Sequence, residues 1–211
     1  MKMEKYYVPV LKKRSFFPDE TVGITVWIKR LWEPSLPDTS SGNENCQNGM
    51  ELHKKIERYL NTGFKEEYTS VEFMHFLKFM KHHSNLMFIV SEKKIESESL
   101  QWRGVIDALF KNGMGEYFIV DWKRIQSMTI TYPLGNRSSM LKREAGTSGV
   151  LQLNLYRIIL EKEYGIAIEG MKIVLLHPDN DTYYVVDIPR LPSMLEHELL
   201  SHRYRQLSHG S

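Results

Sequence analysis

The stretch GVIDALFKNGMGEYFIVDWK, residues 104–123, decides how the middle of this chain folds, because it places charged residues within apolar runs. Asp107 interrupts the first run, and Asp121 and Lys123 end the second. A buried ionised side chain is costly unless it is paired or bound to a metal. These three residues therefore need charged partners in the folded protein.

The two runs predict neighbouring antiparallel strands. Side chains alternate between the two faces of a strand, so Asp121 and Lys123 point the same way. A two-residue turn at Asn112–Gly113 would place Asp107 on the opposite face, whereas a loop of three or five residues would bring the two acids together. Gly115 favours a longer or bulged loop.

The composition is that of an ordinary globular protein. The chain has 211 residues, of which 42% are hydrophobic and 26% are charged, and this predicts a single domain over residues 1–211. Its 28 Lys and Arg against 26 Asp and Glu give a net charge of only +2. Composition therefore allows nucleic-acid binding without announcing it.

Cysteine and hydropathy patterns bear on the cellular location. Cys46 is the only cysteine, which excludes an internal disulfide and an all-cysteine zinc or iron–sulfur site. No apolar run approaches the roughly 20 residues that a membrane span needs, so we expect no membrane partner. We expect an intracellular protein of the cytoplasm or nucleus, although the basic first residues leave an organelle open.

The pattern along the chain predicts an α/β fold with a central mixed β-sheet flanked by helices. Residues 35–49 are polar and predict a loop, which we expect to be mobile. The core is expected over about 49–188. The other predicted elements are a strand or short helix at 22–32, helices at about 50–62, 69–83, 147–165 and 192–207, and strands at 86–96, within the opening stretch, and at 171–177 and 182–188.

Two carboxylates on one face repel each other unless a positive charge lies between them. Oxygen ligands of this kind suit Mg²⁺ or Mn²⁺, which retain waters and bind phosphate oxygens. A lysine two residues from an acid can hold or polarise a metal-bound water, and this set is suited to phosphodiester hydrolysis. The alternative for Asp107, Asp121 and Lys123 is a structural ion pair.

The same residues resemble a family motif. Ile106–Asp107 and Asp121–Lys123 are similar to the signature of the PD-(D/E)XK nuclease superfamily, with Ile in place of Pro. Gln152 and Tyr156 resemble the QxxxY motif of the RecB-type branch, and His53 resembles the helix histidine of that branch. Residues four apart share a helix face, so Gln152 and Tyr156 can reach one groove.

The resemblance implies a restriction-endonuclease-like core and a Mg²⁺- or Mn²⁺-dependent nuclease, similar to phage, viral and mitochondrial single-strand DNA exonucleases. Nucleic acid is the implied partner, DNA rather than RNA, and no protein partner is indicated. The cysteine set of cluster-bearing relatives is missing, so no iron–sulfur cluster is expected. By resemblance, the catalytic residues are Asp107, Asp121 and Lys123, the metal ligands are His53, Asp107, Asp121 and the Trp122 carbonyl, and the substrate contacts are Gln152 and Tyr156.

Two acids are secondary candidates. Glu57 lies one helical turn after His53, and Glu92 resembles a family glutamate ahead of the hairpin. The alternative for Glu92 is a strand-end ion pair with Lys93 or Lys94.

Other functional classes remain open at this point. A viral cap-snatching type of RNA endonuclease would carry the same His, Asp, Asp and Lys set, and a catalytically inactive nucleic-acid-binding module would keep only the binding residues. Unpaired bases can stack on aromatic side chains, and we expect Trp102, Trp122 or Tyr156 to serve a single strand in this way.

Overall fold

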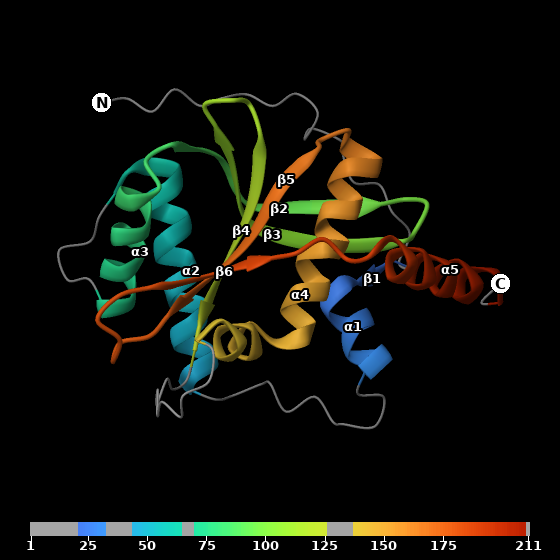
Figure 1. The fold of residues 1–211 in the computed structure, drawn as a ribbon, viewed down its shortest axis with the longest axis horizontal. Helices are drawn as coiled ribbons and strands as arrows, with labels where there is room; N and C mark the ends of the chain where they lie inside the picture. The colour runs from blue at the N-terminus through green and yellow to red at the C-terminus, as the bar shows by residue number, and fades with distance from the viewer. Residues whose placement is uncertain (1–20, 33–43, 65–69, 126–136, 210–211) are drawn as a thin grey trace.

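The computed structural model describes residues 21–32, 44–64, 70–125 and 137–209, which form one mixed β-sheet between two groups of helices (Figure 1). None of the helices within these ranges is both long and apolar enough to span a membrane. The elements in chain order are β1 (Val22–Gly23), α1 (Ile24–Trp32), α2 (Glu44–Thr62), α3 (Val71–His82), β2 (Leu86–Ser97), β3 (Trp102–Asn112), β4 (Tyr117–Arg124), α4 (Arg137–Tyr164), β5 (Ile168–Leu176), β6 (Tyr184–Ile188) and α5 (Ser193–His209).

The sheet is organised around the long strand β3. The strand order is β1-β3-β4-β5-β6, and β2 pairs with β3 along nearly its whole length. Because β2 occupies one edge of β3, β1 and β4 share the other edge: β4 pairs with residues 108–111 and β1 pairs with Trp102 and Arg103. The β1–β3 and β4–β5 pairs are parallel and the rest are antiparallel. The predicted α/β class with a mixed sheet flanked by helices is confirmed.

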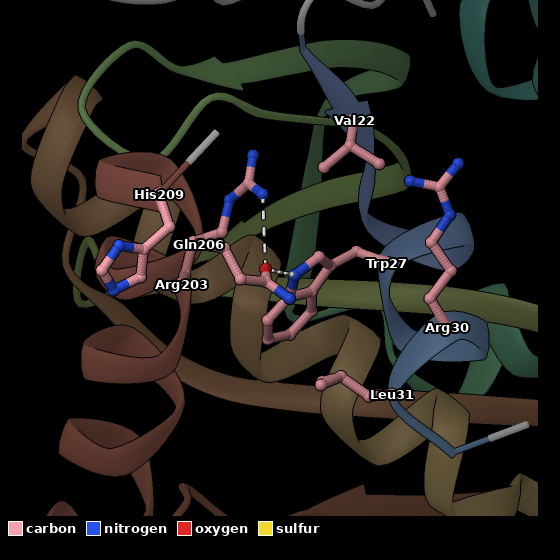
Figure 2. A pocket seen from close by; sticks show the side chains of 7 residues that line it. All are labelled: Val22, Trp27, Arg30, Leu31, Arg203, Gln206 and His209. Atoms are coloured by element: carbon pink, nitrogen blue, oxygen red, sulfur yellow. Dashed lines mark hydrogen bonds between the residues drawn. The ribbon is translucent and has the colours of Figure 1, made fainter. Parts of the chain in front are cut away.

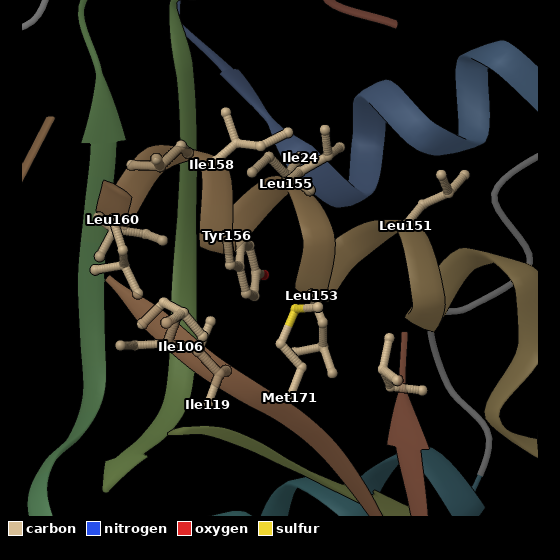
Figure 3. Close-up of a cluster of buried hydrophobic side chains, with 14 of the residues drawn as sticks. Ile24, Ile106, Ile119, Leu151, Leu153, Leu155, Tyr156, Ile158, Leu160 and Met171 are labelled. Atoms are coloured by element: carbon tan, nitrogen blue, oxygen red, sulfur yellow. The ribbon is translucent and has the colours of Figure 1, made fainter. Parts of the chain in front are cut away.

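Two hydrophobic cores cover the two faces of the sheet. The first joins α1 and α4 to the sheet, with Ile24 and Tyr156 packed near Ile106 and Ile119 (Figure 3). The second joins α2 and α3 to the other face through residues such as Phe76 and Trp122. Residues from strands 22–23 to 184–188 and from all five helices contribute, which is the sandwich that the sequence predicts.

Helix α4 approaches β3 closely at a glycine. A Cβ built on Gly104 would lie 2.4 Å from Cε1 of Tyr156, a distance that no side chain can tolerate. The bare glycine backbone therefore makes room for the Tyr156 ring. This contact sets the height of α4 over the strand that carries Asp107.

Three sequence-based boundaries meet different outcomes. The predicted loop at 35–49 is wrong for residues 44–49, where α2 has already begun, and residues 35–43 lie outside the described part of the chain. The polar composition misled because Gln47 and Met50 are exposed, and a surface helix needs only one apolar stripe. The C-terminal helix predicted at 192–207 is observed as Ser193–His209.

Replacing Gly104 by alanine tests the close approach of α4. The new methyl group must displace the Tyr156 ring or push the strand away, and we expect a loss of about 1–3 kcal/mol in the free energy of unfolding, measured with urea. Gly49→Ala in α2 is the matched control, because nothing lies within 4 Å of its Cβ position. That control should be neutral or slightly stabilising. A Gly104→Ala protein as stable as its parent would contradict this packing.

Candidate active site

The β3–β4 connection is a five-residue loop over residues 112–116. The ladder pairs Ala108 with Val120 and continues to Lys111 with Tyr117, so the numbers of paired residues add to 228. The Asn112 side chain closes the loop by accepting a hydrogen bond from the Glu116 amide at 3.0 Å. The two-residue turn that would separate the acids is therefore absent from this hairpin, and the odd-length loop is confirmed.

The ladder stops where the acids begin. The next pair after Ala108 and Val120 would be Asp107 and Asp121, but Asp107 Oδ2 instead accepts a hydrogen bond from the Trp122 amide at 2.9 Å. The carboxylate takes the place of a backbone acceptor, and the two strands part at this point. We call this place the strand fork.

Asp121 and Lys123 form a close ion pair at the strand fork. Lys123 Nζ lies 3.2 Å from Asp121 Oδ1 and 2.9 Å from Oδ2. The second contact is not aligned as a hydrogen bond, so Oδ2 is a buried oxygen that accepts none. Burial acts to lower the pKa of Lys123, but the charges of Asp121 and Asp107 outweigh it and raise that pKa. Lys123 is therefore a cation and a proton donor at neutral pH.

Helix α2 brings His53 to the same place. Its Nε2 lies 2.8 Å from the Trp122 carbonyl oxygen, and its Nδ1 lies 3.5 Å from Asp107 Oδ2 and 3.8 Å from Glu92 Oε1. One ligand atom from each of His53, Glu92 and Asp107 can be chosen so that all three lie within 4.8 Å of one another. Asp121 does not belong to that tighter group.

The backbone at Glu92 is unusual. Its φ of 47° is in the left-handed region, which a non-glycine residue in a strand rarely adopts and which costs on the order of 1 kcal/mol or more. Asn61 of α2 donates a hydrogen bond to the neighbouring Ser91 Oγ at 2.7 Å. This bond ties the helix that carries His53 to the strand that carries Glu92.

The two secondary candidates therefore separate. Glu92 lies with His53 and Asp107, and the alternative pairing with Lys93 or Lys94 is not among the ion pairs of the described residues. Glu57 lies one turn along α2, where its carbonyl accepts a hydrogen bond from Asn61, and it does not join the group. The sequence gave Glu92 only as a resemblance, since its left-handed backbone leaves no mark in the pattern of residues.

The strand fork has an excess of negative charge. Burial, and next the charge of Asp121, raise the pKa of Asp107 to about 7. Burial acts to lower the pKa of His53, but the bond with Glu92 and the charges of Asp107 and Asp121 raise it overall. The site thus holds protons that an ordinary surface would release, and a bound cation would replace them.

Tyr156 and Gln152 lie on the α4 side of the site. Gln152 Nε2 donates to the Tyr156 hydroxyl at 2.8 Å. Burial raises the pKa of Tyr156 to about 12, and the charges of Asp121 and Asp107 add to the effect. The phenol is therefore a neutral group close to the acids.

The expected stacking on aromatic rings is wrong for all three candidates. Trp102, Trp122 and Tyr156 are 0%, 1% and 3% exposed. Trp122 packs edge-on against Phe76 and Phe79 in the core. These rings stabilise the fold, because a large aromatic side chain buries more apolar area than any other.

No protein-family model matches the chain, and no curated protein matches it. Three solved structures are similar at low levels. The protein SSO0001 has a TM-score of 0.45 and 14% identity, covering 92% of this chain and 79% of its own. An alkaline exonuclease from Laribacter hongkongensis has a TM-score of 0.45 and 11% identity over 89% and 88%. A phage-related exonuclease from Haemophilus somnus 129PT has a TM-score of 0.41 and 13% identity over 90% and 96%. Likenesses this distant carry no argument, so the functional reasoning rests on the site.

The raised pKa of Asp107 predicts how the metal-free protein responds to pH. The folded state holds this proton more tightly than the unfolded state, so the stabilisation is full below the ordinary pKa near 4 and is lost as pH rises toward 7. In EDTA, the free energy of unfolding should fall by on the order of 2 kcal/mol between pH 5 and pH 8. Urea titrations at several pH values measure this.

Asp107→Asn should remove most of that fall, because the amide can still accept from the Trp122 amide but carries no titrating group. Asp187→Asn is the control, since Asp187 is an exposed acid of β6 that pairs with Lys172. It should keep the pH dependence of the parent protein. Equal slopes for Asp107→Asn and the parent would show that Asp107 does not hold the proton.

Proposed function

We propose that this chain is a Mg²⁺- or Mn²⁺-dependent nuclease of the PD-(D/E)XK superfamily, RecB-type branch, which hydrolyses phosphodiester bonds in DNA. One observation carries the proposal. Asp107 and Asp121, which are 14 positions apart in the sequence, meet beside Lys123 and His53 where the β3–β4 ladder ends. An apolar sheet gains nothing from that arrangement, whereas a cation site for phosphate chemistry requires it.

The donor set at the strand fork fits a hard divalent cation. Our proposed ligands are His53, Asp107, Asp121 and the Trp122 carbonyl, and Glu92 joins them because it shares the group with His53 and Asp107. The buried Asp121 Oδ2 accepts no hydrogen bond, and so it is free to bind an ion. When bound, Mg²⁺ or Mn²⁺ would polarise the scissile phosphate and lower the pKa of a coordinated water.

The remaining residues of the chain would handle the substrate. Lys123 is held as a cation beside Asp121, so it would orient the attacking water and offset the charge that develops on the phosphate oxygens. The neutral Tyr156 hydroxyl and the Gln152 amide can each donate to a phosphate or sugar oxygen. They would position the strand rather than carry out the chemistry.

The finer substrate class rests on the motif resemblance. We propose an exonuclease that acts on single strands or ends, because Gln152, Tyr156 and His53 match the branch to which the single-strand DNA exonucleases belong. A gel of end-labelled single- and double-stranded DNA and RNA measures this preference directly. Cleavage of RNA alone would favour the viral type of RNA endonuclease, and binding without cleavage by a folded protein would favour the inactive module.

Cleavage should require a divalent cation. We expect activity with Mg²⁺ or Mn²⁺, none in EDTA, and recovery when the cation is restored, because carboxylates and one imidazole suit both ions. The gel assay with and without chelator measures it. Full activity after exhaustive chelation would contradict the proposed mechanism.

Lys123→Ala should lower kcat by about 10²–10⁴-fold, because it removes the donor that orients water and stabilises charge. Substrate affinity should change little. Lys172→Ala is the matched control, since Lys172 is also a strand lysine paired with an aspartate, in β5, away from the strand fork. Unchanged turnover in Lys123→Ala, with Lys172→Ala also unchanged, would mean that the lysine has no catalytic role.

Gln152→Ala separates substrate handling from chemistry. The variant keeps the acids and Lys123, so we expect KM to rise more than kcat falls. Steady-state kinetics on a single-stranded oligonucleotide measure the two constants. A fall in kcat alone would instead place Gln152 in the chemical step.

A further inference from the structure

A second cavity lies away from the strand fork, between α1 and α5. Its volume is about 320 Å³, and its walls combine cationic and apolar side chains (Figure 2). The lining residues are Val22, Trp27, Arg30, Leu31, Arg203, Gln206 and His209. We call it the α1–α5 pocket.

Arg203 is the buried charge of the α1–α5 pocket. It is 8% exposed, and its guanidinium donates to the carbonyls of Leu100 at 2.8 Å and Gln101 at 3.1 Å. A third contact, to Gln206 Oε1, is long at 3.5 Å. All three acceptors are neutral, and no carboxylate of the described residues pairs with Arg203. Burial accordingly lowers its pKa.

An uncompensated buried cation is costly, and proteins normally place one only beside an anion. A guanidinium has five N–H donors, of which three have acceptors here. The remaining donors belong to a side chain that lines the pocket. The missing counter-charge therefore points to an anionic ligand.

The rest of the α1–α5 pocket narrows the class of that ligand. Arg30 is exposed on α1 and has no carboxylate partner among the described residues, and His209 adds a group that can become cationic. Val22 and Leu31 supply an apolar wall. The volume exceeds what a lone phosphate needs and is near the lower end for organic ligands. A phosphate joined to a sugar and a flat base has the required charge, size and apolar surface.

We propose that the α1–α5 pocket binds a nucleotide unit, with its phosphate at Arg203 and Arg30 and its base or sugar against Val22 and Leu31. Two sources share this chemistry: a free mononucleotide, and one nucleotide of a longer strand. The strand source rests on the proposed function. Val22 pairs with Trp102, and Asp107 lies five residues further along β3, about 17 Å away. A stacked strand spans that distance in roughly five nucleotides.

Binding measured in EDTA keeps this site independent of cleavage. Fluorescence anisotropy would follow a labelled 5′-mononucleotide and a labelled single strand of about 12 nucleotides, at physiological salt. Arg30→Glu is compared with Arg205→Glu, which makes the same charge change on an exposed arginine of α5 outside the pocket. We expect Arg30→Glu to weaken binding about tenfold or more, and Arg205→Glu by less than about threefold.

Gln206→Glu gives a second readout that a folding defect cannot imitate. A carboxylate at this position would accept from both Trp27 Nε1 and Arg203 and would supply the counter-charge internally. The thermal unfolding midpoint should therefore rise by a few degrees while nucleotide binding falls. Parental binding by Gln206→Glu, or equal losses in Arg30→Glu and Arg205→Glu, would overturn the proposal.

The two probes distinguish the sources. An Arg30-dependent loss with the mononucleotide identifies a free nucleotide as the ligand, and a loss confined to the longer strand identifies the strand. The nuclease proposal fails separately: a parent protein that cleaves nothing but binds either probe through Arg30 keeps the α1–α5 pocket. A parent that cleaves but shows equal losses in both arginine variants loses the pocket and keeps the nuclease.

Discussion

The structure depends on the constraint that two carboxylates face each other at the inner end of a β-ladder. Asp107 and Asp121 continue the register of β3 and β4, but like charges cannot form a buried pair without compensation. The protein resolves this with a Lys123 ion pair, a backbone amide for Asp107 and a proton held at a pKa of about 7. Each of these devices could be replaced by a cation, and this is why a place of poor packing can be a place of function.

The surrounding fold positions the strand fork from both layers. From one side, α2 carries His53, and the Asn61–Ser91 bond fixes that helix to β2 beside the strained Glu92. From the other side, Gly104 lets the Tyr156 ring approach β3, and Tyr156 holds Gln152 on the same helix face. Neither layer contacts the acids by accident, since each does so through a residue whose local geometry admits few substitutes.

Much of this site could be read from the sequence because strand alternation and helical spacing are short-range rules. Alternation placed Asp121 with Lys123, and the i, i+4 spacing joined Gln152 to Tyr156. The turn was undetermined, since Asn112–Gly113 suits a two-residue hairpin and only the closure by Glu116 shows the five-residue loop. Burial was also out of reach. Trp102, Trp122 and Tyr156 looked available for stacking, but their exposure depends on helices that are distant in sequence. The start of α2 at Glu44 was hidden by polar residues on its solvent side.

The central claim, that the strand fork holds a divalent cation, is tested most directly by anomalous diffraction from crystals of the protein grown with Mn²⁺. The account predicts a manganese peak about 2.0–2.4 Å from oxygens of Asp107 and Asp121 and from the Trp122 carbonyl, with His53 or Glu92 alongside. Asp107→Asn crystals should lose most of the peak. Manganese that binds only elsewhere, with Lys123 still paired to Asp121 and the strand fork filled by protein atoms alone, would contradict the account.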